Sequence, residues 1–180
     1  MAHPNSSQMI WVTTVALTLV AGWFDGWTHR IPNWLTVSGF LAGIALNSAT
    51  VGFKGTLTAL EGAALGFLIL VPLAYMRALG AGDLKLVTAV GSFLGPTLLW
   101  LVLFGSVFVA GAIALILVVR ARRFRETLRN LGFLIVSLLT LGFRSYPEIS
   151  LDNPRLLKLP FGVAVAIGTM SCFVAAKWIA

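Results

Sequence analysis

Two aspartates, Asp25 and Asp83, lie where long apolar stretches of the chain break, and their type and position suggest chemistry. The chain has only six acidic residues among 180, and carboxylates at membrane depth are costly, so these two call for a functional explanation. Two carboxyl groups brought within about 3 to 5 Å share a proton, so one can act as a base on water while the other donates to a carbonyl oxygen. The pair therefore predicts a hydrolytic site of the aspartic type.

The segment after Asp25 contains residues that could support such a site. It reads Arg-Ile-Pro-Asn at positions 30–33, and its proline would stop one helix and set up the next. We predict Arg30, Pro32 and Asn33 as supporting residues. The alternative for Asp25 is a surface acid that screens Arg30 or His29, and a lone loop histidine such as His29 is not predicted to be catalytic.

Asp83 follows two glycines, Gly80 and Gly82, at the expected start of a helix. An aspartate there is a common helix cap, and this is the alternative to a catalytic role. A cap does not need two glycines one residue apart, whereas close approach of another chain or unusual dihedral angles would use them. An extended substrate peptide could pair with this strip. Lys85 could orient Asp83 or anchor the chain at the cytoplasmic surface.

The composition determines the fold class that must position these residues. The chain is 58% hydrophobic and 11% charged, which is typical of a polytopic membrane protein. We predict an all-α fold in a single membrane domain, residues 1–180, because helices satisfy their own backbone in lipid. The six predicted transmembrane helices are residues 8–24, 34–51, 56–79, 84–94, 96–119 and 159–180.

The distribution of basic residues predicts the orientation of these helices. Eleven of the 13 Lys and Arg residues fall in connections on one side, leaving Lys54 and Lys177 on the other. The positive-inside rule makes the first side cytoplasmic, so both termini face outward and both aspartates lie at the cytoplasmic face. The net charge of +7 is explained by orientation, and no nucleic acid partner is expected.

Between the last two predicted transmembrane helices, a basic run at 120–129 precedes an apolar stretch at 131–143. This stretch is too short for a comfortable span, so we expect an amphipathic segment lying at the inner face of the membrane. Its basic residues could hold anionic lipid headgroups or dock a substrate, and the sequence leaves both open.

No metal or cofactor is expected, because the sequence lacks the spaced His and Cys ligands that a zinc site would need. The single cysteine, Cys172, is interpreted as a small buried hydrophobe. Glu61, inside the third predicted helix near Lys54, is interpreted as reaching toward the outer surface and is left out of the site.

Asp25 with the Arg-Ile-Pro-Asn segment after it, the Gly-Ala-Gly-Asp-Leu-Lys-Leu segment at 80–86 and the Leu-Pro-Phe-Gly segment at 159–162 together resemble the type IV prepilin peptidases. These are membrane aspartyl proteases of the Gly-x-Gly-Asp class. The resemblance implies that Asp25 and Asp83 are the catalytic pair of an aspartic-type endopeptidase. It also implies a bacterial inner-membrane enzyme that cuts the leader of prepilin-like proteins at the cytoplasmic face, after a glycine.

Two departures from the family pattern refine this expectation. Larger members carry a cytoplasmic insertion with paired Cys-x-x-Cys motifs and an N-methyltransferase activity, and this chain has neither that insertion nor those cysteines. It is therefore similar to the short, peptidase-only branch that serves tight-adherence (Flp-type) pili. Val163 stands where the last helix of the family often has a second proline.

Two other classes of function stay open from the residues alone. A small proton-coupled transporter or channel could also use paired acids, although such acids should lie near the bilayer midplane in broken helices. A non-enzymatic scaffold for pilus assembly would need neither aspartate. Which prepilin is cut and the oligomeric state stay open as well.

Overall fold

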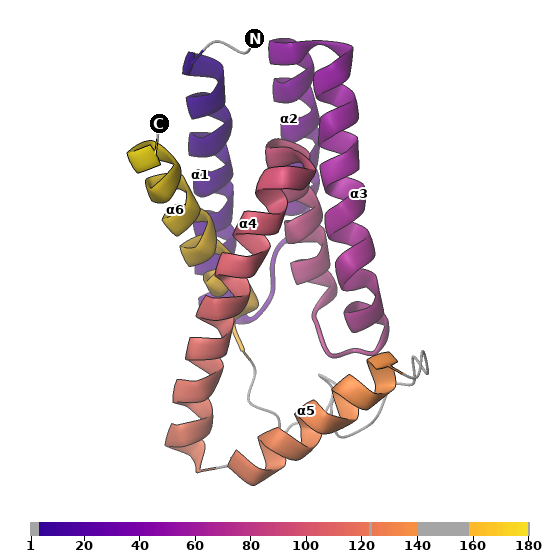
Figure 1. Cartoon of the computed structure of the whole chain (residues 1–180), viewed down its shortest axis with the longest axis vertical. Helices are drawn as coiled ribbons and strands as arrows, with labels where there is room; N and C mark the ends of the chain where they lie inside the picture. Colours follow the sequence, from indigo (N-terminus) through magenta and orange to yellow (C-terminus); the bar gives the residue numbers. More distant parts are fainter. Residues whose placement is uncertain (1–3, 123, 140–158, 180) are drawn as a thin grey trace.

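A computed structural model of the chain describes residues 4–122, 124–139 and 159–179. This part of the chain is helical and contains no strand. Its helices are α1 (Pro4–Thr28), α2 (Asn33–Val51), α3 (Phe53–Tyr75), α4 (Ala81–Ala121), α5 (Phe124–Leu139) and α6 (Phe161–Ile179). Figure 1 shows five of them in a bundle, with α5 lying across one end.

The prediction of an all-α polytopic membrane protein is confirmed. Among the described helices, α1, α2, α3, α4 and α6 are long and apolar enough to cross a membrane. The predicted count of six is not confirmed: the predicted segments 84–94 and 96–119 both lie in the 41-residue element α4, which counts as one of the five. The predicted break between them is present, because Gly95 is not helical and separates two helical parts of α4. The chain reverses direction there, since a Cβ added to Gly66 of α3 would meet both Val87 and Leu99.

The bend in α4 occurs at Gly95, whose φ of 69° and ψ of 178° lie outside the helical region. A positive φ of this kind favours glycine, and the next residue, Pro96, has no N–H to continue the hydrogen-bond ladder. The first leg of α4, residues 81–94, packs on α2 and α3, and the second leg, residues 96–121, packs on α6. Figure 1 shows the two legs running in different directions.

Asn47 of α2 stabilises this bend from outside α4. Its side-chain amide donates to the carbonyls of Ser92, at 3.0 Å, and Phe93, at 2.9 Å. Pro96 cannot donate to the Ser92 carbonyl, so without Asn47 that oxygen would lack its helical partner. Asn47 is only 8% exposed, so water cannot easily replace its amide as the donor to these carbonyls. Losing the amide would therefore lower the free energy of unfolding.

Small residues let the helices approach closely around α4. A Cβ added to Gly62 of α3 would contact the backbone of Gly91 and Gly95, and one added to Gly168 of α6 would contact Ser106. Such small-residue contacts are the usual way in which helices pack in a membrane. Of the seven largest fully buried side chains in the described part of the chain, five belong to α4: Leu86, Val87, Val90, Leu99 and Val102. α4 is therefore the centre of the bundle.

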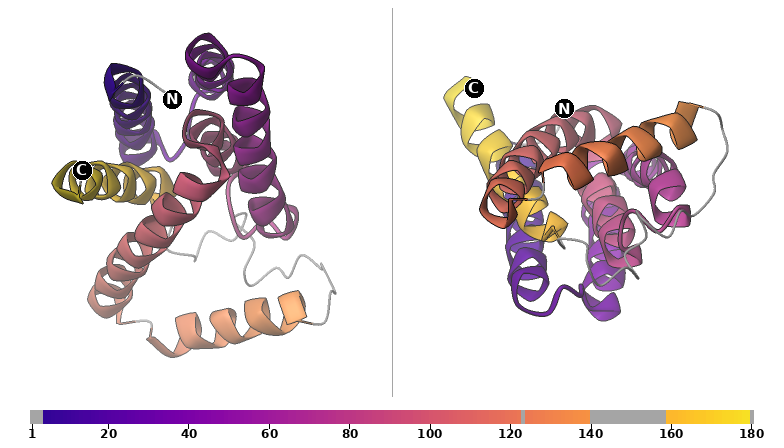
Figure 2. Two further views of the ribbon diagram at one scale, coloured as in Figure 1. Left: turned by 45° about the horizontal axis from the view of Figure 1, so that its top comes forward. Right: turned by 90° about the horizontal axis from the view of Figure 1, so that it is seen from below.

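The two ends of the bundle differ in what they carry. The N- and C-terminal ends of the chain lie toward one end, with the α2–α3 connection (Figure 1). The α1–α2 and α3–α4 connections and α5 lie at the other end (Figures 1 and 2). This arrangement agrees with the grouping of basic residues, while the side of the membrane that each end faces stays a prediction.

The predicted amphipathic segment is observed as α5, as far as the structure describes it. α5 is a separate helix of 16 residues, Phe124–Leu139. It is shorter than the roughly 20 residues that cross a bilayer core, and it lies across the end of the bundle (Figures 1 and 2). The end of the predicted segment, residues 140–143, lies outside the described residues.

Candidate active site

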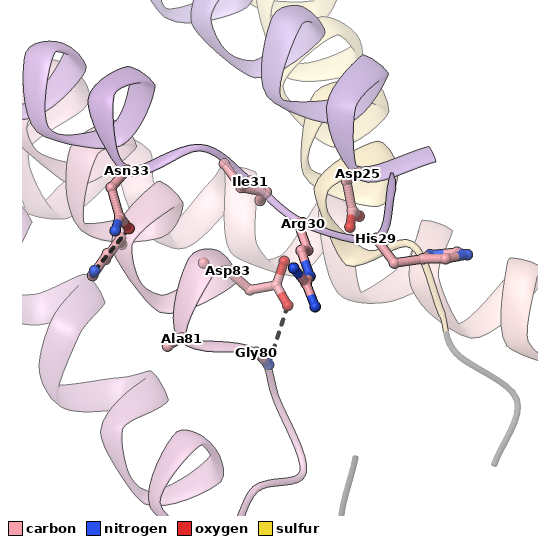
Figure 3. Close-up of a pocket in the computed structure, with 10 residues that line it drawn as sticks. Asp25, His29, Arg30, Ile31, Asn33, Gly80, Ala81 and Asp83 are labelled. Atoms are coloured by element: carbon pink, nitrogen blue, oxygen red, sulfur yellow. Dashed lines mark hydrogen bonds between the residues drawn. The ribbon is translucent and has the colours of Figure 1, made fainter. Parts of the chain in front are cut away.

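A cavity of about 290 Å³ lies at the end of the bundle where α1 ends and α4 begins (Figure 3). Its lining includes both predicted catalytic aspartates and every predicted supporting residue except Pro32, which instead precedes the first turn of α2. The lining residues are Asp25, His29, Arg30, Ile31, Asn33, Gly80, Ala81, Gly82, Asp83 and Lys85. Segments 58 positions apart, counted from Asp25 to Asp83, are thus brought together.

Asp25 lies in the last turn of α1 and is 6% exposed. Its Oδ2 accepts a hydrogen bond of 2.7 Å from the backbone N–H of Gly162, in the first turn of α6. The first N–H groups of a helix have no partner within the helix, and a carboxylate is favoured there by the helix dipole. Asp25 therefore serves as a cap for α6 from a different helix.

The contact with Asp25 is so close that position 162 has room only for glycine. A Cβ at this position would lie 2.9 Å from the Cβ of Asp25 and 3.0 Å from its Oδ2. The backbone of α6 also comes close to Gly22 of α1, where an added Cβ would lie 3.2 Å from the Gly162 carbonyl oxygen. α1 and α6 thus hold Asp25 between them.

Gly162 was not among the predicted site residues. The Leu-Pro-Phe-Gly segment at 159–162 contributed only to the family resemblance. The signal that could have found it is a glycine in the first turn of a helix after Pro160, since such a glycine leaves room for an approaching acceptor.

Asp83 lies in the first turn of α4. Its Oδ2 accepts a 3.3 Å hydrogen bond from the backbone N–H of Gly80, so the aspartate caps its own helix. The helix-cap interpretation is therefore confirmed, and it coexists with a place in the cavity. A carboxylate fixed in this way is also held at a defined position at the cavity wall.

The two glycines before Asp83 have different roles. Neither has a positive φ, so the predicted unusual dihedral angles are wrong. A close approach is found at Gly82, where an added Cβ would lie 3.3 Å from the Cβ of Ile31, while the predicted approach of another chain stays a prediction. The neighbour is the α1–α2 connection of the same chain, and Ile31 is buried there. Gly82 thus allows the segments carrying the two aspartates to pack together.

Asp25 and Asp83 enter the same cavity from α1 and α4 (Figure 3). The described residues contain no group of three or more His, Cys, Asp or Glu side chains that could hold a metal ion. Chemically, the arrangement offers two carboxyl groups at a cavity large enough for water and part of a peptide.

Lys85 contacts α2, not Asp83. Its Nζ donates a 2.9 Å hydrogen bond to Oδ1 of Asn33, joining the start of α4 to the start of α2 (Figure 3). This contact connects two of the predicted supporting residues and braces the cavity. Arg30 and His29 line the cavity as well.

Glu61 and Cys172, which were not predicted as site residues, do not line the cavity. Glu61 is exposed on α3. Cys172 of α6 is half-buried, not fully buried as predicted, and it contributes to the packing around the core.

Comparison with known protein families matches a model of the type IV leader peptidase family to residues 12–115. The chain belongs to the type IV leader peptidase family. The matched region runs from α1 through most of α4, so it includes Asp25 and Asp83 and ends before Gly162. No curated protein and no solved structure matched in the corresponding comparisons. The predicted resemblance is confirmed at the level of this family of peptidases, whose substrates in general are prepilin-like proteins.

Proposed function

We propose that this leader peptidase cleaves the leader from prepilin-like proteins at the cytoplasmic face of the bacterial inner membrane, with Asp25 and Asp83 as its catalytic pair. The observation that carries the proposal is the shared cavity: two of the chain's six acids reach it from different helices at one end of the bundle. Buried acids in a membrane bundle are rare unless they have a function.

In the proposed reaction, one aspartate takes a proton from water while the other, protonated, donates to the carbonyl oxygen of the scissile bond. The hydroxide equivalent bonds to the carbonyl carbon and forms a tetrahedral intermediate. Its collapse breaks the C–N bond, the departing amine receives the proton that the first aspartate took, and the second aspartate recovers its proton from a hydroxyl of the intermediate as the carbonyl reforms. The pair then returns to its starting state, and no other reactant is consumed.

Positioning of the two carboxyl groups supports this mechanism. Each has one oxygen held by the backbone N–H of a glycine: Gly162 for Asp25 and Gly80 for Asp83. Backbone donors move little, so both groups are oriented before a substrate arrives. Gly162 and Gly80 are therefore positioning residues in the proposed mechanism.

The substrate proposed for this site is an extended, basic leader with glycine before the cleaved bond, followed by an apolar helix. The negative charge of the aspartate pair attracts the basic residues of a leader. The apolar helix could pack against the membrane helices, many of which expose apolar side chains outward. The absence of a cysteine-bearing insertion from the sequence supports assignment to the short branch that serves tight-adherence pili.

The test is cleavage of a co-expressed prepilin-like substrate with a basic leader by the intact chain, Asp25→Asn and Asp83→Asn. Glu61→Gln is the matched control, since it neutralises an exposed acid on α3 outside the cavity. We expect both Asn variants to fold in detergent and to lose cleavage, with the control unchanged. Normal cleavage by either folded Asn variant would refute the catalytic pair. A pilus assembly scaffold predicts that both Asn variants still support assembly.

A further inference from the structure

The apolar side of α5 is not covered by the described part of the chain. Leu128, Leu131 and Ile135 follow helical spacing along this side, and their exposed fractions are 59%, 49% and 47%. Arg125 lies at the edge of this side, because it is three positions before Leu128, and Arg129 lies farther round the helix. A helix of this kind lies in the membrane interface with its apolar side toward the acyl chains.

An apolar groove of about 190 Å³ lies between α5 and the second leg of α4. The α4 residues that line it recur every three or four positions, so they form one face of that helix. Gly111 leaves the groove open, because nothing lies within 4 Å of a Cβ added there. The groove is lined by Gly111, Ala114, Leu115, Val118, Thr127, Leu128 and Leu131.

Exposed arginines surround the turn that joins the two walls of this groove. Those described are Arg120, Arg122, Arg125 and Arg129. Glu126 is the only acid between residues 110 and 147, so the turn is strongly basic. An apolar groove beside clustered guanidinium groups is complementary to a molecule with a hydrocarbon tail and an anionic head.

We propose that this groove binds one acyl chain of an anionic phospholipid, with its phosphate held by Arg122 and Arg125. The choice of a lipid over the substrate rests on the proposed function, since a basic leader would be repelled by the arginine cluster. The position of the groove also fits a lipid, because α4 is a membrane-spanning candidate and α5 crosses its end. Bound lipid would fill the space between α4 and α5.

The test counts lipids on the purified full chain by native mass spectrometry after equilibration with equal amounts of phosphatidylglycerol and phosphatidylcholine. We expect about one phosphatidylglycerol to be retained per chain, with roughly tenfold preference over phosphatidylcholine. Arg122→Gln with Arg125→Gln should abolish the preference, and Ala114→Leu should remove the retained lipid by filling the groove.

Two matched controls accompany these variants. Lys54→Gln with Lys177→Gln removes the same number of charges at the opposite end of the bundle, and Ala42→Leu adds the same bulk to an exposed site on α2. Both controls should retain the lipid. Equal retention of the two lipids, retention by Ala114→Leu, or equal loss in the charge control would overturn the proposal. Displacement of the bound lipid by soluble glycerol phosphate would overturn it too. That result would mean that the site binds the phosphate group alone and that the groove does not hold an acyl chain. Because lipid is counted and cleavage is not, this test can fail while the proposed peptidase function stands.

Discussion

At the scale of single residues, the contact between Asp25 and Gly162 joins the proposed chemistry to the packing of α6. The N–H of Gly162 fixes Oδ2 of Asp25, and there is no free space between them for a side chain. A displacement of about 1 Å in a reacting group can cost on the order of 100-fold in rate. Gly162 should therefore affect cleavage more strongly than stability.

Gly162→Ala tests this assignment. The added methyl group must push Asp25 away, so we expect cleavage to fall on the order of 10- to 100-fold while the variant still folds. Gly26→Ala, at the residue directly after Asp25, is the control, because its Cβ would meet only the Val163 side chain, at 3.5 Å. Cleavage rate and thermal unfolding in detergent would be measured for both. Equal, small losses in the two variants would mean that Gly162 does not position Asp25.

The hydrogen bond between Lys85 and Asn33 makes a second residue-scale prediction. Lys85→Ala and Asn33→Ala should each lower the free energy of unfolding modestly. The double variant should lose less than the sum of the two single losses, because each single variant already removes the contact. We expect a coupling of about 0.5 kcal/mol, because the pair is exposed and water competes with it. A double-mutant cycle of unfolding in mixed micelles measures this coupling, and a value of zero would show that the contact does not brace the cavity.

At the scale of elements, the bend at Gly95 depends on α2 as much as on α4. Asn47→Leu would keep the volume but leave the Ser92 and Phe93 carbonyls without the amide donor. We expect a loss of about 2 kcal/mol in the free energy of unfolding, the usual cost of unsatisfied buried polar groups. Thr50→Val is the control, since the Thr50 hydroxyl bonds only to carbonyls within α2. Similar losses in the two variants would contradict a role for Asn47 at the bend.

The helical elements and the two aspartate segments could be predicted from the sequence because they depend on local signals. Apolar runs, Pro32 and the glycines before Asp83 mark where helices begin and end. Gly95 and Pro96 correctly predicted a break in this region, whereas its support by Asn47 of α2 could not be predicted, because that contact joins two separate helices. The Asp25–Gly162 contact spans 137 positions and depends on packing of α1 against α6, which local patterns do not encode.

At the scale of the whole molecule, the orientation of the bundle can be tested by labelling. In a Cys172→Ala background, a cysteine at Lys54 should react with an impermeant reagent from outside the cell. A cysteine at Arg122 should react only in inverted vesicles, because the basic residues mark the cytoplasmic side. Both positions are exposed and lie at opposite ends of the bundle. Labelling of both from the same side would refute the predicted topology.

The capping of α6 by Asp25 has a consequence for how the protein is made. A ribosome completes both aspartate segments before it reaches Gly162, so the growing chain contains its two acids before it contains the donor that fixes one of them. On the proposed function, we expect cleavage to be slow during translation until α6 has been inserted and the N–H of Gly162 reaches Asp25. A copy whose synthesis stops before α6 should therefore cut little of what it meets.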